Sequence, residues 1–126
     1  MYAYKRTLSL DYDTAVARFR EELQKEGFGI LTEIDVKATI KKKLGLDFDR
    51  YIIMGACNPP FAHRALLAER DVGVMMPCNV VVYEQDGKTY AATTLPTVTM
   101  SAVQNEKLAP LAVEVEAKLK KALDAV

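Results

Sequence analysis

The sequence has few of the residues that most metal and thiol sites require, with only two cysteines and one histidine. A chain of 126 residues buries about two-thirds of its unfolded surface in a single core, so neither a disulfide nor a metal is needed to hold it together. Because no secretory signal is apparent, both thiols are expected to be reduced, and we expect a cytoplasmic protein.

The sequence also lacks an excess of charge of either sign, since 17 basic side chains are matched by 17 acidic ones. Nucleic acids and anionic membranes select proteins with an excess of lysine and arginine on one face, so the balance argues against both partners. The first ten residues contain no continuous apolar run, and we expect neither a signal peptide nor a membrane span.

Motifs of the common catalytic and nucleotide-binding sites are absent as well. The sequence has no Walker loop, dinucleotide fingerprint, nucleophile elbow or zincin motif. We therefore expect no cofactor and no resident metal, and the balance of these observations is against an enzyme.

Hydrophobic periodicity predicts one domain over residues 1–126 in which strands and helices alternate. No repeat or low-complexity segment divides the chain. Asp13 is expected to cap the first helix and Asp35 the second, and Pro60 to open the third. Asp86-Gly87 predicts a hairpin turn. Strands are expected over residues 5–10, 28–33, 51–57, 74–83 and 88–94.

The last part of the chain has the clearest helical pattern, interrupted before Pro110. Its apolar residues form one stripe, which is typical of a helix that packs on a sheet. Pro77, inside the fourth predicted strand, implies a bulge or an unpaired edge position. Together these elements favour an α+β domain with a mainly antiparallel sheet, while parallel pairing through crossovers stays open. The stripe consists of Leu108, Leu111, Ala112, Val115, Leu119, Ala122, Leu123 and Val126.

Two segments place a Cys-Asn pair beside proline, namely residues 55–60 and 76–82. Both lie at the end of, or inside, an apolar run that reads as a strand. We expect these strands to be neighbours, so that the two irregular segments converge and shape one wall of a cavity. The candidate pocket residues are Cys57, Asn58, Pro59, Pro60, Pro77, Cys78 and Asn79.

These segments make the sequence similar to the DUF302 family, which is named for its lack of an assigned function. Further matching residues are Gly27-Phe28, Glu33 to Val36, Lys43 to Gly45 and Gly73, so the resemblance covers nearly the whole chain. It implies a TBP-like α+β fold in which a single curved, mainly antiparallel sheet is covered on one face by helices. It also implies a homodimer, and it implies no catalytic residues.

The two thiols allow a second interpretation. Cys57 lies just before a predicted helix start, where a thiolate is stabilised, and His63 follows six residues later. Cys57, Cys78 and His63 together would offer three metal ligands, although their spacing matches no familiar zinc pattern. We favour packing of both cysteines as small apolar residues, and the helical wheel places His63 toward solvent.

Asparagine and methionine side chains also have two interpretations. Asn58 and Asn79 either bond nearby backbone groups at a strand end and a bulge, which we favour, or leave backbone groups free for a ligand. The methionines pack in the core or line an adaptable apolar pocket. They are Met54, Met75, Met76 and Met100.

Two hypotheses for function follow. The first, which we prefer, is a noncatalytic dimeric module that binds a small molecule or a partner peptide beside the two irregular segments. The second is a thiol-redox or metal-binding protein that uses Cys57 and Cys78, with His63 or an outside ligand completing the site. The run Val80-Val81-Val82 must place valines on both faces of a strand, so one valine is a candidate for the dimer interface.

Overall fold

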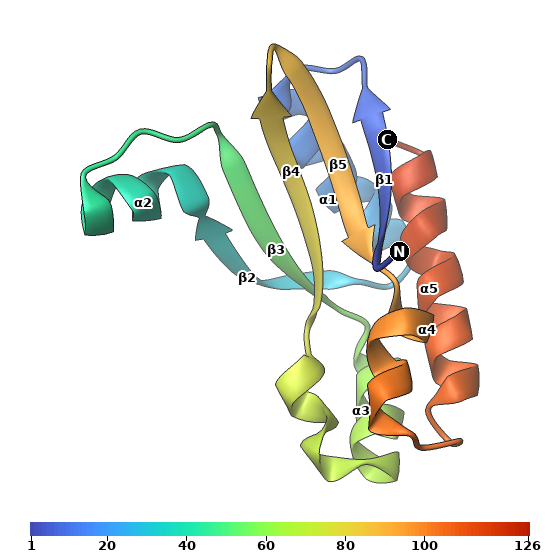
Figure 1. Cartoon of the computed structure of the whole chain (residues 1–126). Coiled ribbons are helices and arrows are strands. Elements are labelled where there is room, and N and C mark those ends of the chain that lie inside the picture. Colours follow the sequence, from blue (N-terminus) through green and yellow to red (C-terminus); the bar gives the residue numbers. More distant parts are fainter.

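The structure is a computed structural model that describes all residues, 1–126 (Figure 1). Its five strands form one sheet in the order β1-β5-β4-β3-β2, and every neighbouring pair is antiparallel. The predicted α+β class and mainly antiparallel sheet are confirmed, and no pair of strands is parallel. The strands are β1 (Ala3–Leu8), β2 (Gly29–Asp35), β3 (Tyr51–Cys57), β4 (Cys78–Gln85) and β5 (Lys88–Thr94).

The helices lie on one side of the sheet and beyond its ends. Figure 1 shows α1 behind the sheet, α5 along its right side, α3 and α4 below it, and α2 projecting to the left. No helix is long and apolar enough to cross a membrane. The α-helices are α1 (Tyr12–Lys25), α2 (Val36–Leu44), α3 (Pro59–Ala68), α4 (Pro96–Thr99) and α5 (Ala109–Asp124), and two 3₁₀ helices are η1 (Arg70–Met75) and η2 (Met100–Val103).

The main core lies between the sheet and the pair α1 and α5. Met54 of β3, Val80 and Val82 of β4 and Ala91 of β5 point into it and are fully buried. Phe19 of α1 and Leu119 of α5 meet them from the helical layer. The stripe predicted for the C-terminal helix therefore packs on a sheet face as expected, while the opposite face of the sheet carries no helix.

The helix caps follow local chemistry, with one correction. The first helix is capped by Asp11 and not by Asp13, because the Asp11 carboxylate accepts the Thr14 amide at 3.4 Å. Asp13, two residues later, instead accepts a hydrogen bond from Arg50. The second predicted cap is confirmed, since Asp35 accepts from the Ala38 amide at 2.9 Å.

Pro77 does not lie in a strand, which corrects the predicted bulge or edge position. β4 begins at Cys78 and is a central strand, and the apolar residues before it form the 3₁₀ helix η1. Pro77 follows a cis peptide bond immediately before the strand, where its missing N–H removes no ladder hydrogen bond. The predicted strand over residues 74–83 therefore starts too early. Val74 is apolar, but it lies in η1 and is almost fully exposed.

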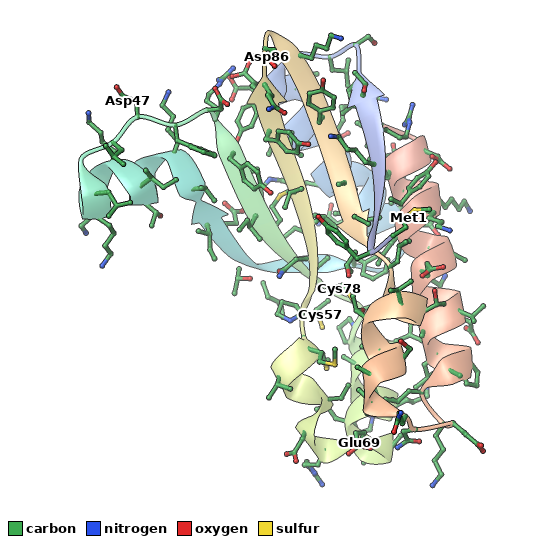
Figure 2. The ribbon with its side chains drawn as sticks, in the orientation of Figure 1. Met1, Asp47, Cys57, Glu69, Cys78 and Asp86 are labelled. Atoms are coloured by element: carbon green, nitrogen blue, oxygen red, sulfur yellow. The ribbon has the colours of Figure 1, made fainter.

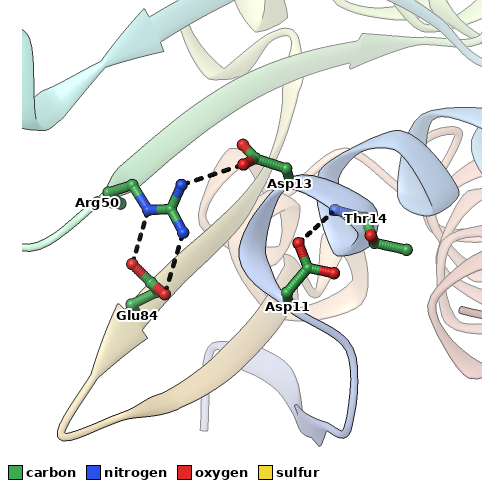
Figure 3. Close-up of polar contacts among 5 residues, drawn as sticks. All are labelled: Asp11, Asp13, Thr14, Arg50 and Glu84. Atoms are coloured by element: carbon green, nitrogen blue, oxygen red, sulfur yellow. Dashed lines mark hydrogen bonds and ion pairs between the residues drawn. The ribbon is translucent and has the colours of Figure 1, made fainter.

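One ion-pair network fastens the start of β3 to its neighbours (Figure 3). Arg50 donates from Nε and Nη2 to both carboxylate oxygens of Glu84, at 2.7 and 3.2 Å, and from Nη1 to Asp13 at 3.2 Å. The guanidinium also lies 4.5 Å from the centre of the Tyr12 ring. Arg50 lowers the pKa of Glu84, so this carboxylate stays charged and the contact joins β3, β4 and α1.

Gly55 lets the chain pass very close to two side chains. A Cβ at this position would lie 2.2 Å from Oγ1 of Thr32 and 2.5 Å from Cγ of Pro77. Both distances are shorter than van der Waals contact, so any larger residue at position 55 must displace the Thr32 side chain and the Pro77 ring. The glycine is therefore required by its neighbours.

Gly55→Ala is expected to lower the free energy of unfolding by about 1–3 kcal/mol, the usual cost of overpacking. Denaturant unfolding measures the change. Gly29→Ala is the matched control, because Gly29 lies in the neighbouring strand with no atom within 4 Å of its Cβ position, and it should change stability by less than about 1 kcal/mol. Equal stabilities for the two variants would contradict the close approach.

Candidate functional site

An apolar cavity of about 50 Å³ lies where β3 ends and β4 begins. Its walls come from six parts of the chain: the residue before β2, the end of β3, the start of α3, the turn into β4 with its first residue, the segment α4 with η2, and α5. Figure 2 shows Cys57 and Cys78 near each other at this end of the sheet. The lining residues are Phe28, Ala56, Cys57, Asn58, Phe61, Ala62, Ala65, Met76, Pro77, Cys78, Pro96, Met100, Leu111, Ala112 and Val115.

The two Cys-Asn segments are neighbours, as predicted. Ala56 of β3 pairs with Cys78 of β4, and Gly55 pairs with Asn79. Four of the predicted residues line the cavity together, namely Cys57, Asn58, Pro77 and Cys78. The expected convergence of the two irregular segments is therefore confirmed as geometry.

Three predicted residues do not reach the cavity. Pro59 and Pro60 form the exposed first turn of α3. Asn79 is exposed and lies on the helix-free face of the sheet, because side chains alternate along β4 and its neighbour Cys78 points to the helical side. The prediction grouped Asn79 with Cys78 because the two are adjacent in the sequence, but their side chains point to opposite faces of the sheet.

Most of the cavity wall was absent from the predicted pocket. Phe61 and Ala65 of α3 form part of this wall, and so do Leu111 and Val115 of the α5 stripe, which was expected to pack on the sheet. Among the other wall residues, only Met76 and Met100 had a predicted pocket interpretation, because methionine adapts to irregular apolar spaces. Whether these surfaces close completely or leave a space depends on how three helices meet.

Asn58 is buried and has a structural bond. Its Nδ2 donates to the backbone carbonyl of Glu26 at 3.1 Å, which joins the start of α3 to the end of α1. Gly27 follows with φ of 89°, and a Cβ there would lie 3.1 Å from the same Nδ2 atom. The preferred structural role of Asn58 thus agrees with its contacts, although the carbonyl it meets belongs to a distant segment.

The thiols are free and differ in environment. Burial, with a smaller contribution from neighbouring Cys57, raises the pKa of the Cys78 thiol to about 11. A thiol with such a pKa is almost entirely protonated at neutral pH, and the thiolate is the form that attacks or binds metal. The surroundings of Cys78 therefore suit packing better than thiol chemistry.

His63 does not join the cysteines. It is exposed on α3, as the helical wheel predicted, and is not among the residues that line the cavity. No group of three or more histidine, cysteine, aspartate or glutamate side chains has the arrangement of a metal site. The three-ligand set of the second hypothesis is not assembled within this chain.

A larger and more polar hollow adjoins the apolar cavity. It has a volume of about 370 Å³ and lies between α5 and the segment of α4 and η2. Pro96, Met100 and Ala112 line both spaces. Ser101, Gln104 and Glu106 give the hollow an exposed polar side. A small apolar cavity and a larger polar hollow thus lie side by side.

Asn58→Ala is expected to destabilise the protein by about 1–3 kcal/mol, because the carbonyl of Glu26 loses its donor in a buried place. Asn79→Ala is the control, since Asn79 is exposed, and its effect should stay within about 0.5 kcal/mol. Chemical denaturation of both variants makes the comparison. Equal effects would contradict the role of the Asn58 bond.

Cys57→Ala leaves Cys78 as the only thiol, and its alkylation at pH 8 should be about 100-fold slower in the folded protein than in urea, because burial keeps the thiol protonated. The rate should rise steadily with pH above 8, because burial, the larger cause of the raised pKa, is still present without Cys57. Mass spectrometry of quenched samples gives both rates. Folded and unfolded rates that agree at pH 8 would show an accessible thiolate.

Comparison with known proteins places the chain in a family. Its sequence matched no curated protein. Its structure is similar to the crystal structure of an uncharacterized conserved DUF302 protein from Bacillus stearothermophilus, with a TM-score of 0.93, 32% sequence identity, and coverage of 99% of this chain and 98% of that one. The family model described as "Domain of unknown function DUF302" matches residues 4–126. The chain therefore belongs to the DUF302 family.

Proposed function

We propose that this domain is a noncatalytic, homodimeric binding module that holds a small amphipathic molecule in the apolar cavity and the polar hollow beside it. The single observation that carries the proposal is that the two spaces are adjacent and share Pro96, Met100 and Ala112 as lining residues. An apolar group of the ligand fits the narrow end, and its polar group faces Ser101 and Gln104.

The size and the lining of the cavity limit the ligand. About 50 Å³ holds a short apolar group, since a single water already needs about 10–15 Å³ in the same measure. Asn58, the polar side chain of this wall, already uses its amide on Glu26. Apolar contact therefore provides the attraction, at about 0.8 kcal/mol for each buried methylene.

A noncatalytic role fits the chemistry of the wall. A general acid or base must lie within hydrogen-bond reach of the reacting group. Apart from the two cysteines, no side chain lining the apolar cavity can ionise. Cys78 has its pKa raised away from neutrality, and the only histidine is elsewhere on the surface of α3.

The thiol hypothesis has one observation in its favour, which is that Cys57 and Cys78 line the same cavity. Against it stands the raised pKa of Cys78, which suppresses the thiolate that redox or metal chemistry needs. Binding of an amphipathic molecule uses the same walls without requiring this ionisation, and it is the function that the geometry supports better.

Ala62→Leu tests the proposal by filling the cavity from α3. The wild-type protein should be stabilised by butanol, hexanol and octanol and by the matching carboxylates, by about 2.7 kcal/mol at a concentration about 100 times the dissociation constant. The filled variant should lose this shift because its leucine occupies the apolar end. Thermal unfolding with each compound measures the effect.

Ala117→Leu is the matched control, because Ala117 is exposed on α5 and does not line either space. This variant should keep the wild-type response. A wild-type protein that shows no shift with any member of the series, or equal shifts for both variants, contradicts binding in the cavity.

A further inference from the structure

One segment of the chain has almost no contact with the core. Every residue from 31 to 49 is exposed except Val36 and Ile40, which are half-buried. We call residues 36–49, which comprise α2 and the loop to β3, the arm. Figure 2 shows Asp47 near its tip, far from the cavity beside Cys57 and Cys78. Exposed apolar side chains along the segment are Leu31, Ile34, Leu44, Leu46 and Phe48.

The helix of the arm lacks the packing that a helix of its length requires. It has nine residues and none is buried. Isolated helices shorter than about 12–15 residues are marginal in water, and helices in proteins owe most of their stability to an apolar face that packs on a neighbour. The Asp35 cap adds only about 1 kcal/mol. The exposed apolar side chains of the arm are thus free to pack against another surface.

The helix-free face of the sheet is the second uncovered surface, and we call it the open face. Tyr51, Tyr83 and Tyr90 stack along it, with ring centroids 5.1 and 5.3 Å apart, and the amine of Lys5 lies 4.4 Å from the centre of Tyr90. A hollow of about 340 Å³ lies between these rings and the N-terminus. The open face consists of Lys5, Thr7, Tyr51, Ile53, Asn79, Val81, Tyr83, Tyr90, Ala92 and Thr94.

The arm and the open face form one continuous surface. Ile34, in β2 just before the arm, pairs with Ile53 of the open face. At the other end of the arm, the ring of Phe48 lies 6.4 Å from the ring of Tyr51. An aromatic and aliphatic centre with charged residues around it is the usual composition of a protein interface. A partner that docks here contacts both parts at once.

We infer that the arm and the open face together dock a second copy of this chain. Each copy has a projecting arm that needs an apolar surface, and an apolar sheet face that needs a cover. A two-fold axis satisfies both needs, because each arm then lies against the partner's surface while its own surface receives the partner's arm. The inference rests on the homodimeric state proposed above and assigns its interface.

The size of the surface fits this occupant. The arm and the open face supply about 20 residues per copy, the lower end of a standard interface. The arm carries Lys37, Lys41, Lys42 and Lys43, but Lys41 already pairs with Asp47 at 3.2 Å, and Asp35 and Asp49 flank the helix and the loop. The four lysines against Asp47 and Asp49 leave the arm with a net charge of +2, so an anionic membrane is the competing occupant that the vesicle measurement below tests.

Leu44→Asp is the variant that tests the interface, and Leu67→Asp is its control. Both leucines lie in the last two positions of a helix, and both are 67% exposed, Leu44 on the arm and Leu67 on α3. Sedimentation equilibrium should show a wild-type dimer. Leu44→Asp should raise its dissociation constant by about 100-fold, because the symmetric contact repeats the buried charge twice. Leu67→Asp should leave the dissociation constant unchanged.

Hydrogen exchange of the wild-type protein is the second measurement, so that a poorly folded variant does not decide the result. Amides of α2 should be protected at concentrations where the dimer forms and should lose that protection on dilution. A wild-type dimer that both variants leave intact overturns the assigned interface alone. A monomeric wild-type protein, with or without binding to phosphatidylserine vesicles, overturns the dimer as well. The alkanol response of Leu44→Asp reports separately on the cavity.

Discussion

Burial of one sheet face beneath α1 and α5 is the constraint on which the remaining structure depends. Phe19 and Leu119 meet Met54, Val80 and Val82 across this layer, and all are fully buried. Because side chains alternate along a strand, fixing these residues in the core also fixes which residues face the other way. The open face and its stacked tyrosines are thus a direct consequence of the core.

The same layer also determines where the cavity forms. The main core ends where β3 and β4 meet the helices beyond the sheet, and a second small core of Ala65, Val72 and Leu108 begins there. Between these two cores the walls are apolar but do not close fully. A space between two cores can accept an apolar group without disturbing either one, which is the physical basis of the proposed binding.

The candidate site was partly predictable. Cys57, Asn58, Pro77 and Cys78 could be found because a Cys-Asn pair beside proline occurs twice, each time at an apolar run that predicts a strand. The walls from α3 and α5 gave no separate signal, since an apolar helical face looks the same whether it closes a core or borders a space. Asn79 was grouped with the site by position, although strand alternation turns it away.

By itself the sequence determined the α+β class, the hairpin at Asp86-Gly87, the β3 bounds, the second helix with its cap and the buried stripe of α5, because each depends on local propensity and periodicity. Tertiary structure alone decided the strand order, the place of Pro77 before a central strand, the bond from Asn58 to Glu26, and the exposure of the arm. These features depend on contacts between residues that are far apart in the chain, which no local pattern records.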